Sequence, residues 1–172
     1  MVPAVYGDAA ERAQGVLEIR IKDHREAIDD FNEFKITIEK LLLAPKPGFK
    51  FWQTRWQDLG VAPETVDLTK YRGKKSARVF RRAIDAGSFD AFQLKLKMID
   101  AVLKSNRRSA PVKNAVVPVQ QSFEVAAKSE TILIIDLVVI DLSDHPPRGY
   151  ELSIGGYEIY TDGKLTKKIP PG

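Results

Sequence analysis

The sequence predicts an all-β protein, an antiparallel two-sheet β-sandwich with one short inserted helix near residues 74–85. Three observations support this fold class. Short segments alternate apolar and polar residues, turn residues separate these segments, and a single segment has the apolar spacing of a helix. With 172 residues the chain can bury a full core in one domain, and no apolar run reaches the ~18 residues of a membrane helix.

Period-2 patterns predict the first strands. Residues 15–23 (GVLEIRIKD) place aliphatic residues on one face and charged residues on the other, and residues 33–44 (EFKITIEKLLLA) repeat the pattern. We expect these two strands to pair through the acidic loop between them. Residues 46–60, which follow a Pro-Gly turn, and residues 63–71 are expected to add a third and a fourth strand.

The pattern then changes to a helical one. Ala77, Phe80 and Ile84 stand at i, i+3 and i+7, which is the spacing of one face of a helix. Gly87 follows at a position where a helix commonly ends. These residues predict a helix of about two to three turns, over residues 74–85.

The second half of the chain again has strand patterns. We expect strands or extended segments within residues 88–99, 112–125, 130–142 and 149–163. Pro118 indicates an edge or a bulge, and Gly155-Gly156 indicates a strand kink or bulge. A turn is expected at Lys128-Ser129. The sandwich is therefore assigned to residues 15–162, with an N-terminal arm at 1–14 and a C-terminal arm at 163–172.

Five stretches carry a resemblance to a known family: GVLEIRIKDHREAIDDFNEFKITIEKL, VDLTKY, RAIDAGSFDAFQLKLKM, FEVAAKSETILIIDLVV and GYELSIGGYEIY. In this order they resemble the exported bacterial domains of the DUF4382 family, over about residues 15–160. Asp23-His24 stands where Asp-Ala-Pro is usual, and Lys128-Ser129-Glu130 replaces a Gly-containing hairpin, so the chain resembles a divergent member. Asp136 matches an Asp of the family's Leu-Asp-Phe-Asp stretch, and we expect it to accept hydrogen bonds at a strand crossing or sheet margin.

The resemblance also implies an architecture and a location. It implies a prealbumin-like or immunoglobulin-like sandwich at the periplasmic or extracellular face of a membrane, although a cytoplasmic location stays open. It implies no catalytic residues, since the family has none established.

Residues that could carry chemistry are few. The absence of cysteine excludes thiol nucleophiles, disulfides and cysteine-ligated metals. The two histidines, His24 and His145, are expected to be ordinary surface residues. The acidic residues between the first two strands could offer oxygen ligands to Ca²⁺, but they lack the spacing of a calcium loop, so a solvated connection is the main expectation. These residues are Asp23, Glu26, Asp29, Asp30 and Glu33. The sequence predicts no enzyme, no cofactor and no metal site.

Charge is distributed unevenly along the chain. Residues 70–113 carry 13 Lys and Arg against three Asp and Glu, a balance of +10, within a chain of net charge +4. Such a segment can steer the protein toward an acidic partner or an anionic membrane surface. Nucleic acid is not expected, because the aromatic residues are not interleaved with the basic ones. The candidate partner-binding residues are Arg72, Lys74, Lys75, Arg78, Arg81 and Arg82.

Two functions are weighed. The main expectation is a non-catalytic, extracytoplasmic accessory subunit that docks on other protein subunits of a larger, membrane-bound complex, with an electron-transfer or photosynthetic complex as the suggested host. Polar, Pro-containing termini would lie across the partner. The alternative is a carbohydrate-binding or cell-surface-binding module, in which Trp52 and Trp56 form an aromatic platform.

Overall fold

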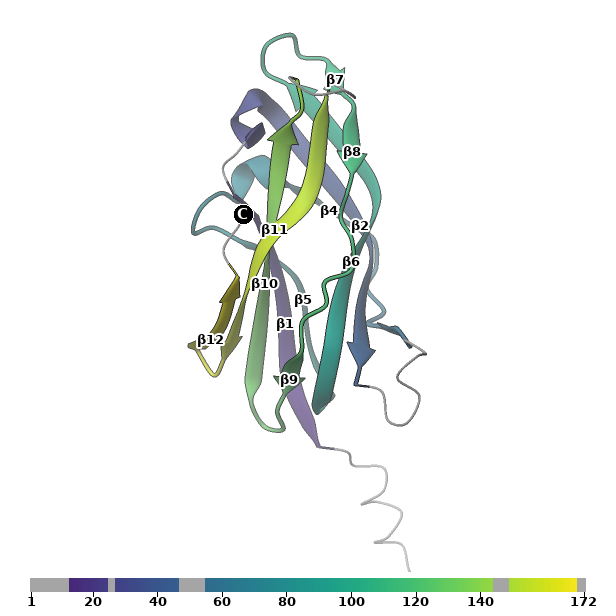
Figure 1. Ribbon diagram of the computed structural model, residues 1–172, viewed down its shortest axis with the longest axis vertical. Helices are drawn as coiled ribbons and strands as arrows, with labels where there is room; N and C mark the ends of the chain where they lie inside the picture. Colours follow the sequence, from purple (N-terminus) through teal and green to yellow (C-terminus); the bar gives the residue numbers. More distant parts are fainter. Residues whose placement is uncertain (1–12, 25–26, 47–54, 144–148, 170–172) are drawn as a thin grey trace, which may run out of the picture.

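The fold is described here from a computed structural model, which describes residues 13–24, 27–46, 55–143 and 149–169. Two β-sheets pack against each other, with strands that run mainly along the long axis of the molecule (Figure 1). This arrangement confirms the predicted all-β sandwich. The helices in these ranges are two short 3-10 turns, η1 (Ala27–Asp30) and η2 (Leu68–Lys70), and no helix in the described ranges has the length and apolar character needed to cross a membrane.

Within the described ranges each sheet contains six strands. Sheet A consists of β1 (Gln14–Asp23), β5 (Ala77–Asp85), β8 (Val112–Asn114), β10 (Glu130–Asp141), β11 (Tyr150–Thr161) and β12 (Lys164–Ile169). Sheet B consists of β2 (Phe31–Pro45), β3 (Gln57–Asp58), β4 (Glu64–Asp67), β6 (Gly87–Leu103), β7 (Ser109–Ala110) and β9 (Phe123–Val125). The order in sheet A is β12-β11-β10-β1-β5, and β2 and β6 form the centre of sheet B.

Most neighbouring strands are antiparallel, as predicted, but two pairs are parallel. β1 lies parallel to β10, and β8 lies parallel to β11. The expected pairing of the first two strands is wrong, because β1 belongs to sheet A and β2 to sheet B. The η1 turn stands between them in the sequence, and its Ile28 is buried in the core. The connection therefore leads from one sheet to the other.

The predicted helix near residues 74–85 is also wrong, because this segment contains β5, which pairs with β1. Ala77, Phe80 and Ile84 do share the core-facing side. Their helix-like spacing arises because the register between β5 and β1 shifts at Val79, which adds one residue between Ala77 and Phe80. Gly87 does not end a helix but begins β6.

The core lies between the two sheets. β1 and β10 supply alternate aliphatic residues from sheet A, and β2 and β6 supply them from sheet B. Aromatic rings fill both ends, with Phe31 packed edge-on against Phe34 and Tyr150, and Phe92 edge-on against Tyr157. The predicted inward residues of the first strand, Leu17, Ile19 and Ile21, are at most 2% exposed.

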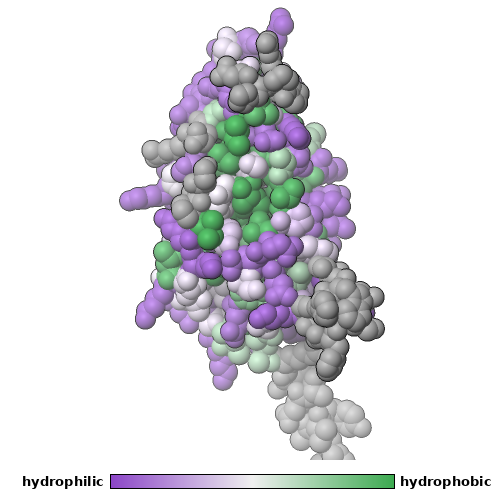
Figure 2. All heavy atoms as spheres, in the orientation of Figure 1, coloured by the Kyte–Doolittle hydropathy of each residue, from purple (hydrophilic) through white to green (hydrophobic). Residues whose placement is uncertain are grey.

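The two sides of the sandwich differ. On one side β8 pairs with sheet A and β9 with sheet B, so residues 115–122 cross between the sheets. Val116 and Val119 of this crossing pack against the core. Figure 2 shows apolar side chains gathered in the middle of the view that contains β11 and this crossing, surrounded by hydrophilic ones. On the other side β5 forms the edge of sheet A, and β3 and β4 flank β2 in sheet B.

β10 is a central strand, so its two faces differ. Leu133, Ile135 and Leu137 are fully buried in the core, and Asp136 lies on the opposite face of the sheet. The expected position of Asp136 at a strand crossing or margin is therefore wrong. Its Oδ1 atom has no hydrogen-bond partner among the described residues, and its Oδ2 atom lies 4.0 Å from the Nζ atom of Lys22.

Three local predictions can be compared with the strands. The register of β10 and β11 shifts beside Gly155, which confirms the bulge predicted there. Lys128 has a φ of 58°, as expected for a residue in the predicted turn. Residues assigned to the C-terminal arm include β12, an edge strand that pairs with β11 and is exposed throughout (Figure 1). The N-terminal arm is outside the described residues except for its last two positions.

Candidate partner-binding surface

Three of the predicted partner-binding residues stand on β5, at the edge of sheet A. Arg78, Arg81 and Arg82 are all exposed, although they point to different faces. Arg78 and Arg81 lie opposite Arg20 and Glu18 of β1 on the outer face of the sheet. The structure thus arranges these arginines along a strand edge instead of on the polar face of a helix.

The buried carboxylate of Glu18, on the neighbouring strand β1, pairs with arginines of this edge. Glu18 is 6% exposed, and its carboxylate accepts hydrogen bonds from Arg81 at 2.9 Å and from Arg20 at 3.1 Å. Burial opposes ionisation of Glu18, but these hydrogen bonds and the adjacent positive charges outweigh it and lower the pKa of Glu18 below its usual value. Arg81 also pairs with Glu130 at 2.8 Å. Arg81 is therefore fixed in place by carboxylates.

Arg78 and Arg82 are less neutralised. The guanidinium of Arg78 is 3.9 Å from Glu18, and its side chain is 58% exposed. Arg82 donates a hydrogen bond to the carbonyl oxygen of Leu59 at 2.9 Å and lies 5.0 Å from the centre of the Phe80 ring. It pairs with no carboxylate in the described part of the chain. Both positive charges can face a partner.

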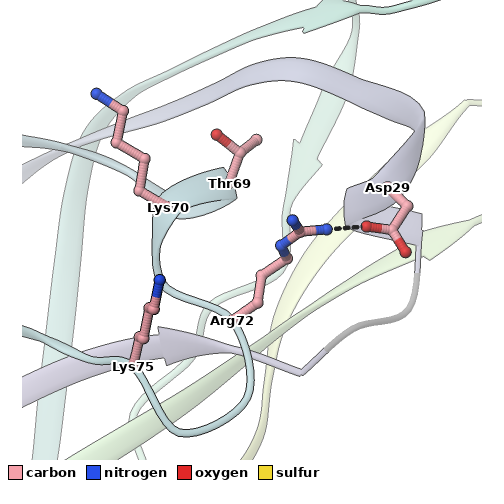
Figure 3. A pocket seen from close by; sticks show the side chains of 5 residues that line it. All are labelled: Asp29, Thr69, Lys70, Arg72 and Lys75. Carbon is pink, nitrogen blue, oxygen red and sulfur yellow. Dashed lines mark hydrogen bonds and ion pairs between the residues drawn. The ribbon is translucent and has the colours of Figure 1, made fainter.

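A basic recess continues this edge toward η2. It has a volume of about 540 Å³ and is lined by Asp29, Thr69, Lys70, Arg72 and Lys75. Figure 3 shows Arg72 turned toward Asp29, with which it pairs, while Lys70 and Lys75 lie apart from this pair. Neither lysine forms an ion pair with another described residue.

Local hydrogen bonds fix the wall of the recess. Asp67 ends β4, and its Oδ1 atom accepts hydrogen bonds from the backbone N–H of Phe34 and from both the N–H and the hydroxyl of Thr69. The pKa of Asp67 is lowered, because these hydrogen bonds outweigh the opposing effect of burial. The carboxylate caps η2 and places Thr69 and Lys70 at the recess.

The predicted cations therefore form one continuous series along the chain. We call this series, with Lys70 added, the basic margin; it consists of Lys70, Arg72, Lys74, Lys75, Arg78, Arg81 and Arg82. Lys74 is exposed in the turn before β5. The rest of the +10 segment lies elsewhere, with Lys95 and Lys97 on β6 of sheet B and Lys104 in the turn that follows β6. The structure divides the basic segment among several surfaces.

A groove lies beside β5, at residues that no sequence pattern predicted as a site. A recess of about 370 Å³ lies between residues 61–64 and residues 79–82. A second recess, of about 310 Å³, shares Val79, Phe80 and Arg81 and extends to Arg78. The sequence contains a weak signal for this groove, because Val61-Ala62-Pro63 is a short apolar run that follows a glycine and lies outside every strand.

The other candidate residues are not brought together. Trp52, Glu26 and His145 lie outside the described residues, and Trp56 is half-buried before β3, so no aromatic platform is described. The acidic residues near η1 have separate partners. Asp29 pairs with Arg72, and Asp30 accepts a hydrogen bond from the Tyr150 hydroxyl at 2.9 Å.

Two further candidates lie at or near the ends of β1 and β2. Glu33 pairs with Lys35 at 3.5 Å. His24, at the end of β1, places its Nδ1 atom 4.0 Å from Asp136.

The fold defines a two-sheet β-sandwich domain with a basic edge. Residues 14–151 match the family described as "Domain of unknown function (DUF4382)", and the chain therefore belongs to the DUF4382 family. This match confirms the resemblance seen in the sequence. Neither the curated proteins nor the solved structures contain a match to the chain.

Proposed function

We propose that the domain is a non-catalytic accessory subunit that docks on an acidic surface of a partner protein through the basic margin. The expected setting is a larger membrane-bound assembly, outside the cytoplasm. One observation carries the proposal: exposed cations follow one another from the recess at η2 along the edge strand β5. Four of these cations, Lys70, Lys74, Lys75 and Arg82, pair with no carboxylate among the described residues.

A protein partner fits this surface better than a lipid surface does. Asp29 lies within the basic recess, and Glu64 lines the groove beside β5. A uniformly anionic headgroup layer would approach both carboxylates unfavourably. A folded partner can instead place acidic groups at the lysines and arginines and donors at the carboxylates. Mixed charge in fixed positions therefore supports recognition of a protein.

The basic margin is expected to act mainly on association. Exposed charges interact over a Debye length of about 8 Å at physiological ionic strength. Electrostatic complementarity of this kind raises the rate of encounter and fixes orientation more than it raises affinity. The complex should therefore weaken steeply with added salt.

The test is purification of the tagged chain from its native membranes at low salt. We expect a stoichiometric partner, whose recovery is lost when Lys70, Lys75 and Arg78 are all replaced by glutamate. A matched control reverses Lys95, Lys97 and Lys104, which are exposed on sheet B and in the turn after β6, and changes the net charge equally. Recovery of a free monomer, or equal loss of the partner in both triple variants, would contradict the proposal.

A further inference from the structure

The outer edge of β5 pairs with no described strand between Arg78 and Arg82. β5 pairs with β1 on one side, and no other described strand pairs with it on its opposite side. An edge strand presents a row of N–H and C=O groups that a further strand can pair with. Arg82 occupies one end of this edge through its hydrogen bond to the Leu59 carbonyl oxygen, and the remainder faces the groove beside β5.

The groove combines an apolar floor with a basic rim along β5, and Glu64 lies on the opposite wall. Val79 and Phe80 are at most 8% exposed and form the floor. The apolar run Val61-Ala62-Pro63 forms the wall opposite β5. Arg78 and Arg81 stand at the rim on the outer face of sheet A. A segment lying here would meet apolar side chains on its inner side and guanidinium groups on its outer side.

We propose that an extended acidic segment of the partner adds to sheet A as a strand beside β5, with its acidic side chains toward Arg78 and Arg81 and apolar side chains toward Phe80. This inference rests on the proposed function, and it specifies how the partner binds. Backbone hydrogen bonds supply affinity and alternate side chains supply specificity in this mode of recognition. The groove accommodates about five extended residues, since the strand from Arg78 to Arg82 rises about 3.3 Å per residue.

A second copy of this chain is a poor occupant. Among the described strands, the other long free edge of sheet A is β12, which carries Lys164, Lys167 and Lys168. Pairing β5 with β5, or β5 with β12, would place cations beside cations, and like charges that face each other across strands are destabilising. An acidic strand has the complementary charge.

Two isomeric peptides test strand addition. The probe is an acetylated, fluorescein-labelled eight-residue peptide in which glutamate and valine alternate. Successive residues of a strand direct their backbone N–H and C=O groups to opposite edges. One isomer is N-methylated at the valines and the other at the glutamates, so each loses the donors of one edge while composition and charge stay the same.

We expect the unmodified peptide to bind, with fluorescence anisotropy as the readout. One isomer should bind as the unmodified peptide does, and the other at least tenfold more weakly, because only one peptide edge faces β5. Equal affinity of the two isomers would overturn strand addition. The proposed function would survive that result if the native partner were still lost on charge reversal of the basic margin, so the two failures are distinguishable.

Protein variants locate the site. Arg78→Glu should weaken the unmodified peptide by roughly threefold to tenfold, because an exposed attraction becomes a repulsion. Lys97→Glu, an equal charge change on sheet B, should leave affinity within twofold. Lys167→Glu tests whether the peptide binds at β12 instead. A larger loss of affinity in Lys167→Glu than in Arg78→Glu would overturn the assignment to β5.

Discussion

Replacement of Asp136 by leucine should stabilise the protein at neutral pH. Asp136 lies on the central strand β10 and is 7% exposed, and its Oδ1 atom has no hydrogen-bond partner among the described residues. Burial, above all, raises the pKa of its carboxyl group, which the charges of Lys22 and His24 only partly offset. Leucine branches at the same carbon as aspartate, although its methyl groups are larger than the carboxylate oxygens, and it has no polar atoms to leave unsatisfied.

The expected gain follows from the contacts of Asp136. A buried acceptor without a partner costs about 1–3 kcal/mol, whereas the ion pair with Lys22 at 4.0 Å contributes about 0–1 kcal/mol. His24, also 4.0 Å away, forms an ion pair only when it is protonated. Lys22 would still form an ion pair in the variant, because its Nζ atom lies 3.6 Å from the carboxylate of Glu158. The net gain should be about 1–2 kcal/mol, which raises the melting temperature by roughly 2–8 °C for a domain of this size.

The gain should depend on pH. Because the pKa of Asp136 is raised in the folded state, its contribution to stability is fully present below the usual pKa of 3.8 and is lost as the pH rises through the higher folded value. The advantage of Asp136→Leu should therefore narrow as the pH falls from 7 toward 4. Urea unfolding followed by circular dichroism at several pH values measures it.

The control is a substitution to leucine at an exposed aspartate. Asp100→Leu, at an exposed position of β6, should change the free energy of unfolding by less than about 0.5 kcal/mol. A loss of more than about 1 kcal/mol in Asp136→Leu would refute the reasoning, because it would show that the carboxylate makes interactions stronger than its desolvation. A gain that does not change with pH would refute the assignment of the effect to ionisation.

Four other outcomes are expected. Gly15→Ala should destabilise the fold by about 1–3 kcal/mol in urea unfolding, because the new Cβ atom would lie 2.2 Å from the carbonyl oxygen of Ala126. Glu18→Gln should cost about 1–2 kcal/mol at pH 7. This cost should disappear in acid, since the stability from a carboxylate of lowered pKa is present above the usual value of 4.5 and lost as the pH falls through the folded one. In an ultraviolet pH titration, Tyr150→Phe should remove the phenol that ionises last, because burial and the hydrogen bond to Asp30 raise the pKa of Tyr150 to about 12. Tryptophan fluorescence titrated with glycans should show no saturable shift if the protein is a docking subunit and not a sugar-binding module.

Long strands with one solvent-exposed face could be predicted from the sequence, but the strands with which they pair could not. β1, β2 and β6 lie where alternation indicated strands, because the period of a strand is local information. The parallel pairing of β1 with β10 joins residues 16 and 130, which nothing near either strand indicates. Adjacency in sequence favoured a β1–β2 pair, but each strand buries its apolar side from a different sheet.

The candidate site shows the same division. Lysine and arginine content predicted which residues would be exposed, since a run of charge is rarely buried. The groove depends on residues 61–64 lying opposite β5, and that placement follows from the pairing of β4 with β2 in the other sheet. A site formed between two sheets cannot be deduced from the charge pattern of one segment.

β5 shows how an edge strand can imitate a helix. From Phe80 to Ile84 the strand keeps its period of two, which places Arg82 on the core-facing side. There its guanidinium lies over the Phe80 ring and donates a hydrogen bond to the Leu59 carbonyl oxygen. Such a charged residue is tolerated on the inner side because β5 is at the margin of the sheet. There the guanidinium is solvated by water and hydrogen-bonded to the neighbouring loop. The added residue Val79 then lengthens the step from Ala77 to three, and the apolar set reads i, i+3, i+7. The features that disguised this strand, a bulge and an inward-pointing arginine, are those by which natural sheets protect an edge from unwanted pairing. An acidic partner strand avoids the charge repulsion that another basic edge would meet, because it offers carboxylates to Arg78 and Arg81 on the outer face.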